Sequence, residues 1–408
     1  MSENNDQNNN TLSSSHSSSK EISIVNNLIS IVTITSLSLG DTLFSQPLPF
    51  LPLDIIIEIL CRLPVKILFK LRCVCKEWDD LISKSNYFAK KHLSFSTTHN
   101  LHFLGYSYYL DKYSLTSYPL HKVFYNKTMK LMQLGSYNPK SFNYNIVGSC
   151  NGILCLANSN EGFVMLWNPS IRKFKELPYF EKPQNIYFDG ITYGFGHDRI
   201  SDKYKVVAIL HYFIRDNDDN FIYKNEVKVH ILGTNFWKNI PEFPCGCFTS
   251  EKGHFVSGAI NWLASKDTGT SIVSFDLENE SYQEILQPDH KNTDDSFWHL
   301  GVLRDCLCMI YDDDVWVMRE YGNKDSWTKL FTIPYIQNPR TSYRFLKIVN
   351  IFEDDQVLLE YVDESIEENW TWKLMVYDSK NDIIKSMEFA EYESTPEVCV
   401  ESLISPYF

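Results

Sequence analysis

The stretch FLPLDIIIEILCRLPVKILFKLRCVCKEW, residues 50–78, decides the fold of the N-terminal part of the chain. Apolar residues recur in it at helical spacing and form the stripe Ile55, Ile56, Ile59, Leu60 and Leu63. Pro52 precedes this helix, where a missing N–H costs nothing, and Pro64 ends it and can begin the next. A second helix carries the stripe Leu68, Leu71, Cys75 and Trp78, and a third helical piece runs on to Leu93. The sequence therefore predicts three short helices.

These helices have more apolar surface than a module of their size can cover. A segment of about 44 residues cannot bury much surface alone, and such short chains are marginal without a partner. Two apolar stripes with little to cover them favour docking against the helices of another protein. The alternative is a small helical bundle packed against its own domain.

The same residues resemble the F-box, the segment that joins a substrate receptor to an SCF-type ubiquitin ligase. The resemblance is carried by Leu51-Pro52, Glu58-Ile59-Leu60, Arg62-Leu63-Pro64-Val65-Lys66, and Cys73-Val74-Cys75-Lys76 with Trp78. It implies docking on a Skp-type adaptor, which bridges to a cullin and a RING subunit. The residues expected either to contact the adaptor or to support the contact face are Leu51, Pro52, Ile59, Leu60, Leu63, Pro64, Leu68, Val74, Cys75 and Trp78.

The composition is that of an acidic globular protein. The 408 residues are 44% hydrophobic and 14% aromatic, which is enough for a substantial core in two or three domains. The net charge of −13 argues against nucleic acid or an anionic membrane as a partner, because both need a basic face. The apolar run over residues 22–39 contains Asn26 and Asn27 and no uninterrupted span of about 20 apolar residues, so no membrane helix is predicted.

The ten cysteines are scattered and do not form a disulfide pattern. Their Cys-x-Cys pairs lack the spacing of zinc ligands, so we expect buried, reduced thiols and no metal. Reduced thiols are typical of a cytoplasmic and/or nuclear protein.

Three segments follow from the composition along the chain. Residues 1–46 are rich in Asn and Ser and are predicted to be disordered. Residues 47–94 form the helical module. From residue 98 to residue 405, short runs rich in Val, Ile, Tyr, Phe and Trp alternate with turn residues, which predicts an all-β domain.

Two units recur in this β region. The first is a tight hairpin with an Asn-Gly turn over residues 147–156, with loose copies over 255–263 and 300–309. The second is an apolar strand, a polar turn and a strand that carries an aromatic residue, first seen over residues 165–178. Irregular repeats near the kelch length of about 50 residues, each worth about four strands, predict a β-propeller, with a pair of β-sandwiches as the alternative. The expected fold class is α+β multidomain, a three-helix F-box followed by a kelch-like β-propeller.

The β region also resembles the F-box-associated domain of plant F-box proteins, a family that includes F-box/kelch-repeat and S-locus F-box proteins. The residues that carry it are 147–156, Leu166-Trp167-Asn168-Pro169-Ser170, Tyr193-Gly194-Phe195-Gly196-His197-Asp198 and Ser274-Phe275-Asp276-Leu277. With the F-box, the resemblance covers nearly all of residues 50–405. It implies that the β domain holds a protein substrate for ubiquitination and degradation.

No catalytic constellation is found in the sequence. Gly194-Phe195-Gly196 lacks the third glycine and the following helix of a nucleotide-binding turn, so a strand is predicted there. The acidic run Asp216-Asn217-Asp218-Asp219 lacks the spacing of a calcium loop, and a solvated hairpin turn is expected. We therefore expect a non-catalytic receptor without a cofactor. Two rival hypotheses are a sugar- or small-ligand-binding propeller outside an SCF complex and a propeller enzyme.

Overall fold

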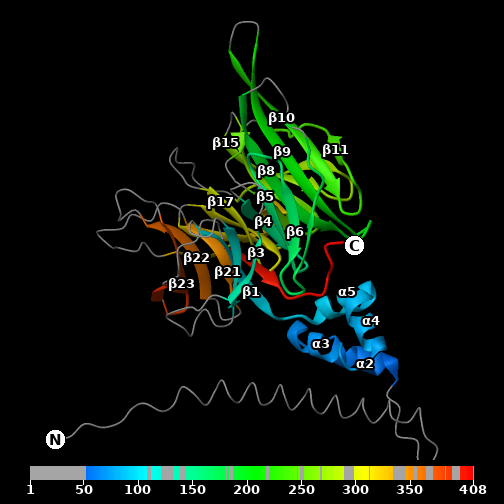
Figure 1. Cartoon of the computed structure of the whole chain (residues 1–408). Helices are drawn as coiled ribbons and strands as arrows, with labels where there is room; N and C mark the ends of the chain where they lie inside the picture. Colours follow the sequence, from blue (N-terminus) through cyan, green and yellow to red (C-terminus); the bar gives the residue numbers. More distant parts are fainter. Residues whose placement is uncertain are drawn as a thin grey trace, which may run out of the picture. The chain divides into compact units, whose positions relative to one another are not determined.

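The computed structural model describes residues 52–107, 112–120, 132–137, 144–180, 182, 187–216, 220–245, 247–248, 252–266, 269–288, 298–311, 313–333, 346–352, 356–363, 371–381, 383–387 and 396–407. The predictions for residues 1–46, including the run 22–39, and for Leu51 lie outside these residues. The chain divides into two compact units, Met1–Ser96 and Thr97–Phe408. The described part of the first is helical and that of the second is built of strands (Figure 1).

The first unit contains four helices in its described part, where the sequence predicts three. They are α2 (Leu53–Leu60), α3 (Val65–Leu71), α4 (Lys76–Lys84) and α5 (Asn86–Phe95). The predicted third helical piece is two helices because Ser85 has an extended backbone. Its Oγ accepts a hydrogen bond from the Phe88 N–H at 3.1 Å, which caps the start of α5.

The two prolines begin helices as predicted. The Pro52 carbonyl accepts the N–H of Ile55 at 3.0 Å, and the Pro64 carbonyl accepts the N–H of Ile67 at 2.9 Å. Fully buried side chains from three of the helices then form the core of the module. They are Leu60, Leu68, Leu71 and Phe88.

In the second unit, the described strands form six antiparallel sheets. The first sheet runs β25 (Glu397–Val400), β1 (His99–Ser107), β2 (Lys112–Pro119) and β3 (Met132–Tyr137). The second runs β4 (Tyr144–Cys150), β5 (Ile153–Asn158), β6 (Val164–Asn168) and β7 (Lys173–Glu176). The third runs β8 (Tyr187–Asp198), β9 (Lys203–Arg215), β10 (Phe221–Ile231) and β11 (Trp237–Ile240).

The remaining three sheets follow the same plan. In the fourth, β12 (Cys247–Phe248) and β13 (His254–Val256) both pair with β14 (Ala259–Lys266), followed by β15 (Gly269–Asp276) and β16 (Ser281–Ile285). The fifth runs β17 (Trp298–Leu303), β18 (Cys306–Tyr311), β19 (Asp314–Met318) and β20 (Trp327–Thr332), with the short 3₁₀ helix η3 (Lys324–Ser326) before β20. The sixth runs β21 (Leu346–Ile351), β22 (Gln356–Asp363), β23 (Thr371–Asp378) and β24 (Ile383–Met387).

The innermost strands close a ring. Each of β25, β4, β8, β13, β17 and β21 contacts the next in this order, and β21 contacts β25. The six sheets are therefore the blades of a β-propeller, numbered here one to six in that order. The propeller prediction is confirmed, and the alternative of two sandwiches is wrong.

The hairpin that recurs in the sequence joins the two inner strands of a blade. Asn151 and Gly152 have φ values of 53° and 83°, as a type I′ turn requires. Ser257 and Gly258 repeat this in blade four, and the pair Arg304 and Asp305 repeats it in blade five. The predicted polar turn joins the two outer strands of a blade. Asn168 in blade two and Asp276 in blade four accept backbone N–H groups of this turn.

Large apolar side chains fill the space between neighbouring blades. Trp262 and Phe275 of blade four are fully buried and belong to one cluster with Val207 of blade three. Gly194 lies in β8, as the sequence predicts, where a Cβ atom would come within 2.5 Å of Ile260 and 2.8 Å of Trp262. Glycine is needed at this position because blades three and four approach closely. The Gly194-Phe195-Gly196 segment therefore has a role in the packing of the two blades.

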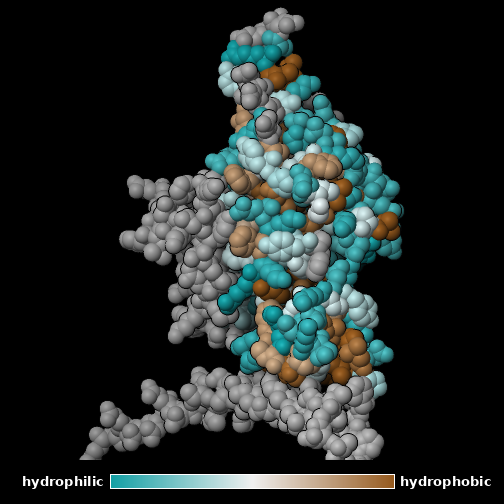
Figure 2. All heavy atoms as spheres, turned by 45° about the vertical axis from the view of Figure 1, so that its right-hand side comes forward, coloured by the Kyte–Doolittle hydropathy of each residue, from teal (hydrophilic) through white to brown (hydrophobic). Residues whose placement is uncertain are grey.

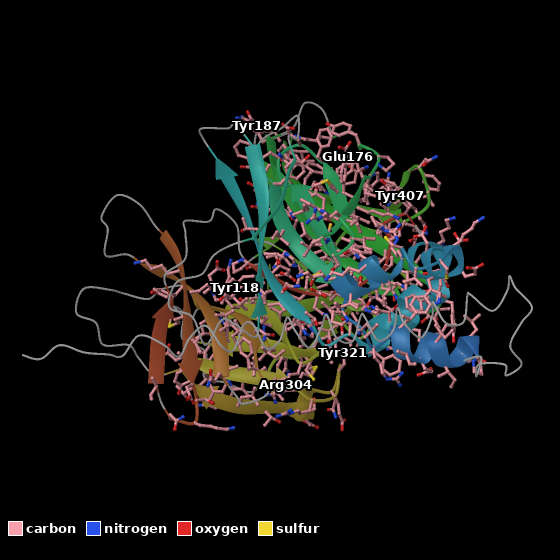
Figure 3. All side chains as sticks on the ribbon, turned by 60° about the horizontal axis from the view of Figure 1, so that its bottom comes forward. Tyr118, Glu176, Tyr187, Arg304, Tyr321 and Tyr407 are labelled. Atoms are coloured by element: carbon pink, nitrogen blue, oxygen red, sulfur yellow. The ribbon has the colours of Figure 1, made fainter. Side chains whose placement is uncertain are left out.

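The last strand closes the propeller. β25 pairs with β1, so blade one combines the beginning and the end of the domain. The segment after β25 then crosses to blade two, where Asn168 Nδ2 donates to the carbonyls of Ser402 at 3.1 Å and Ile404 at 2.8 Å. Ser402 Oγ donates to the Asn151 carbonyl at 2.8 Å, and Tyr407, labelled in Figure 3, donates its hydroxyl to the Phe174 carbonyl at 2.7 Å.

This closure predicts a large effect of Asn168→Ala. The variant leaves buried acceptors of the tail without their donor, and we expect a loss of about 2–3 kcal/mol in the free energy of unfolding. Chemical denaturation followed by tryptophan fluorescence measures it. The control Asp276→Ala removes the equivalent turn contact in blade four, where no tail is bound, and is expected to cost about 1 kcal/mol. Equal losses of unfolding free energy in the two variants would contradict a stabilising role of the segment after β25.

Candidate functional site

Helix α2 is apolar on nearly all sides. Ile57 and Leu60 point into the module and are buried. Leu53, Ile55 and Ile59 remain 57%, 45% and 38% exposed. A helix that is apolar all round is normally buried on all sides, so these exposed side chains are suited to a second protein. Ile55 and Ile59 lie on the outer side of α2 and Leu53 lies at its first turn, and the three together are called the docking face. Hydrophobic side chains gather on the surface of the module in Figure 2.

Ionic contacts hold α2 against α5. Glu58 pairs with Arg62 at 2.7 Å and with Lys91 of α5. Hydrogen bonds from Lys91 and then Arg62 lower the pKa of the Glu58 carboxyl. The Arg62 guanidinium also lies 4.3 Å from the centre of the Phe95 ring. The helix is thus tied to α5 through the Glu58–Lys91 ion pair and the contact of Arg62 with Phe95.

The structure separates the predicted docking residues by burial. Pro52, Ile59 and Pro64 are exposed. Leu63, Val74 and Cys75 are half-buried, and Leu60, Leu68 and Trp78 belong to the core of the module. Leu51 lies outside the described residues. Six of the ten residues are therefore in a position to touch a partner, and three can act only by supporting the face.

Sequence reasoning missed two residues of the docking face. The sequence places Ile55 in the apolar stripe, without a docking role, and assigns no role to Leu53. Because the packing of the module buries Ile57 and Leu60, Ile55 and Ile59 turn to the other side of α2, and helical periodicity alone does not say which side that is.

His92 of α5 contacts the backbone that joins α2 to α3. Its ring is buried, and Nε2 donates to the Leu63 carbonyl at 2.9 Å, while no hydrogen-bond partner is found for Nδ1. Burial lowers the pKa of His92, with a smaller opposing effect from the Leu63 carbonyl. The neutral ring thus links α5 to the connection between α2 and α3.

A second candidate surface lies on the propeller, in blade three. Strand β11 pairs only with the stretch Val227–His230 of β10, so the first half of β10 runs beyond it together with β9 and β8. This overhang projects from the propeller (Figure 1). At the turn that joins β9 to β10, Asp216 accepts the Asn220 N–H at 2.8 Å, as expected for a hairpin turn. Residues 217–219 lie outside the described residues.

One face of the overhang is aromatic. The strand register places Tyr187 opposite Phe213 and Phe221 opposite Arg215. The rings of Tyr187 and Phe221 are 57% and 54% exposed and meet edge to face at 5.0 Å. The Arg215 guanidinium lies 4.8 Å from the Phe221 ring and 5.7 Å from the Tyr187 ring, which is labelled in Figure 3. Exposed aromatic rings with arginine are enriched at the centres of protein interfaces.

Across the described ranges, no group of three His, Cys, Asp or Glu side chains is arranged to hold a metal ion. No helix in the described part of the chain is both long and apolar enough to cross a membrane.

Two family models match the chain. Residues 48–90 match the F-box domain, and residues 107–406 match the F-box associated beta propeller domain. The first match contains α2 with the docking face and ends inside α5, and the second begins at the last residue of β1 and contains the other strands of the six blades.

Curated relatives match over most of their length. An Arabidopsis thaliana F-box/kelch-repeat protein is 31% identical over 324 residues, which are 76% of this chain and 85% of that protein. The F-box protein CPR1 of the same plant is 28% identical, over 87% of this chain and 88% of that protein. Among solved structures, a chain of the nidogen/laminin complex covers 74% of this chain and 99% of its own length at a TM-score of 0.41 and 10% identity, a score too low to bear on function.

His92 predicts a loss of stability in acid. Because its pKa is lowered in the folded state, its contribution is complete above the unfolded pKa of about 6.5 and is lost as the pH falls through the folded value. We expect the unfolding free energy of the helices, followed by circular dichroism at 222 nm, to fall from about pH 7 to 5 less steeply in His92→Gln than in the wild type. The exposed His99→Gln serves as control, and identical slopes in wild type and His92→Gln would refute the assignment.

Proposed function

The chain belongs to the F-box proteins with an F-box-associated β-propeller domain, and from this we propose that it is the substrate-recognition subunit of an SCF-type ubiquitin ligase. The helical module docks on a Skp-type adaptor and, through it, joins a cullin and a RING subunit. The propeller holds a protein substrate for ubiquitination and degradation. The observation that carries the proposal is the docking face of α2, a set of exposed aliphatic side chains on one helix of the module.

Burial of the docking face under a partner's helices would contribute a favourable free energy of binding. Covering the exposed parts of Leu53, Ile55 and Ile59 stabilises a complex by about 1 kcal/mol for each side chain. The half-buried Leu63, Val74 and Cys75 extend the contact. The buried Leu60, Leu68 and Trp78 act indirectly, because they fix the angle at which α2 presents its outer side.

Catalysis in this proposal needs no reactive group in the chain. F-box proteins are generally non-catalytic adaptors, and the thioester chemistry belongs to other subunits. A substrate held on the propeller brings its lysine close to the loaded conjugating enzyme, which converts a bimolecular encounter into one with a high effective concentration. We propose the cytoplasm and/or the nucleus as the receptor's place of action, because its cysteines are free thiols in the described residues.

The overhang of blade three is the part of the propeller that we assign to substrate contact. Tyr187 and Phe221 are large, exposed and held against each other, so they can bind with little loss of side-chain entropy. Arg215 adds a charge at the centre of the same face. This arrangement is typical of the anchor residues of a protein interface. The alternative function, a sugar- or small-ligand-binding scaffold outside an SCF complex, would use the propeller without the docking face.

Ile59→Lys tests the adaptor contact. The side chain already reaches solvent, so the module should remain folded, while a charge in the apolar contact should weaken capture of a Skp-type adaptor at least about tenfold. Co-purification and titration with purified adaptor measure the effect. Ile200→Lys, at an exposed isoleucine of the propeller, is the matched control. Undiminished capture by Ile59→Lys would exclude this face, and failure of the wild type to bind any adaptor, combined with glycan binding, would favour the alternative function.

A receptor that cannot join the ligase should retain its substrates. In cells, the double variant Ile55→Lys/Ile59→Lys should accumulate bound proteins that the wild type loses to degradation. Adding Tyr187→Ala and Phe221→Ala should remove those proteins from the captured set by about tenfold or more, whereas Phe236→Ala, at another exposed ring of blade three, should not. Quantitative mass spectrometry of the captured proteins measures this, and retention after loss of both rings would place the substrate elsewhere on the propeller.

A further inference from the structure

An apolar run of sequence shortly precedes the docking face in the chain. Residues 22–39 lie outside the described residues, and their sequence is ISIVNNLISIVTITSLSL. Ten of these 18 residues are aliphatic and none is charged, whereas segments that stay unfolded are poor in apolar residues and rich in charge. The run therefore has the composition of a segment that binds an apolar surface.

The docking face is an apolar surface of matching chemistry and within reach of the run. Its exposed side chains, Leu53, Ile55 and Ile59, are all aliphatic. Residues 40–52 join the run to α2, and a link of that length can span up to about 40 Å when extended. Helix α2 has eight residues and is about 12 Å long, so the run can reach every part of the face. Such a short link gives the run a local concentration at the face on the order of millimolar.

Other occupants suit the two surfaces less well. The run contains no Lys or Arg, which helices that lie on anionic membranes carry on their polar side. A second copy of the chain would have to approach against a net charge of −13 on each molecule. A segment of the same chain meets neither obstacle.

We propose that residues 22–39 bind the docking face of their own chain and cover it until an adaptor takes their place. The segment is then an intramolecular competitor of the adaptor. Apparent affinity for the adaptor is reduced to the extent that the uncovered state is only a fraction of the chains. This regulatory consequence rests on the proposed function, whereas the contact itself does not, because it forms in the chain alone.

Hydrogen exchange of the isolated full chain tests the contact without any partner. Mass spectrometry of peptides from residues 21–40 measures the exchange of the run. We expect its amides to exchange at least about fivefold faster in Ile59→Lys than in the wild type, because a charge then stands in the apolar contact. Ile200→Lys, at an exposed isoleucine of the propeller, should leave the rate unchanged. Equal rates in Ile59→Lys and the wild type would overturn the proposal.

The reciprocal variant Leu28→Asp/Ile29→Asp changes the run and leaves the docking face intact. In titrations with a purified Skp-type adaptor, it should bind about fivefold more tightly than the wild type, because the face is no longer covered. Ile59→Lys changes the affinity in the opposite direction. Ser17→Asp/Ser18→Asp adds the same charge outside the run and should bind like the wild type. Unchanged or weaker adaptor binding by Leu28→Asp/Ile29→Asp would refute the covering role.

Crosslinking distinguishes the chain's own segment from a second copy. A photo-crosslinking amino acid in place of Ile59, in a mixture of isotope-labelled and unlabelled chains, should link to residues 22–39 of the same molecule. Links mainly between labelled and unlabelled chains would mean that a second copy covers the face, and the proposal would be wrong. If the wild type captures no adaptor at all, the proposed function fails, while hydrogen exchange and crosslinking still decide whether the contact exists.

Discussion

The pairing of β25 with β1 is the contact on which the propeller depends. Each blade covers one face of the next, so an open ring would leave two blade faces and one strand edge in water. Strand β25 has only four residues, and the segment after it adds hydrogen bonds to blade two. Asn168 serves twice, since its Oδ1 accepts from the outer turn of its own blade while its Nδ2 holds the closing segment. Closure is therefore distributed over the backbone pairing of β25, the buried Asn168 amide and the hydroxyl groups of Ser402 and Tyr407.

The helical module obeys a different constraint, because it has too few residues to cover all of its apolar surface. Its core buries the inner side of α2, whereas Ile55 and Ile59 on the outer side are exposed. The ion pairs of Glu58 with Arg62 and Lys91 hold the helix against α5. A propeller can be stable alone, whereas this module is arranged to be completed by association.

Much of the fold follows from local sequence signals. Pro52 and Pro64 begin helices, and the Asn151-Gly152 turn and its copies mark the inner hairpins, because these residues act on the backbone beside them. The repeat length also indicated a propeller. The number of blades did not follow, since insertions make the repeats unequal and the strand that completes blade one lies almost 300 residues from β1 in sequence. For the same reason, the contact of Asn168 with Ser402 could not be predicted. In the docking site, periodicity identified the apolar helix, but it could not tell Leu60, which is buried, from Ile59, which is exposed, because that depends on where α3 and α5 pack.

The late position of β25 has a consequence for synthesis on the ribosome. Strands β1 to β3 emerge first, yet the strand that pairs with the inner side of β1 emerges only after all the other blades. Until then the nascent domain exposes an incomplete sheet, and the long sequence separation of its closing contacts makes the final step slow. A chain that terminates early would keep this unpaired edge permanently, in a form that chaperones and proteases recognise. Only a fully translated domain can close its ring.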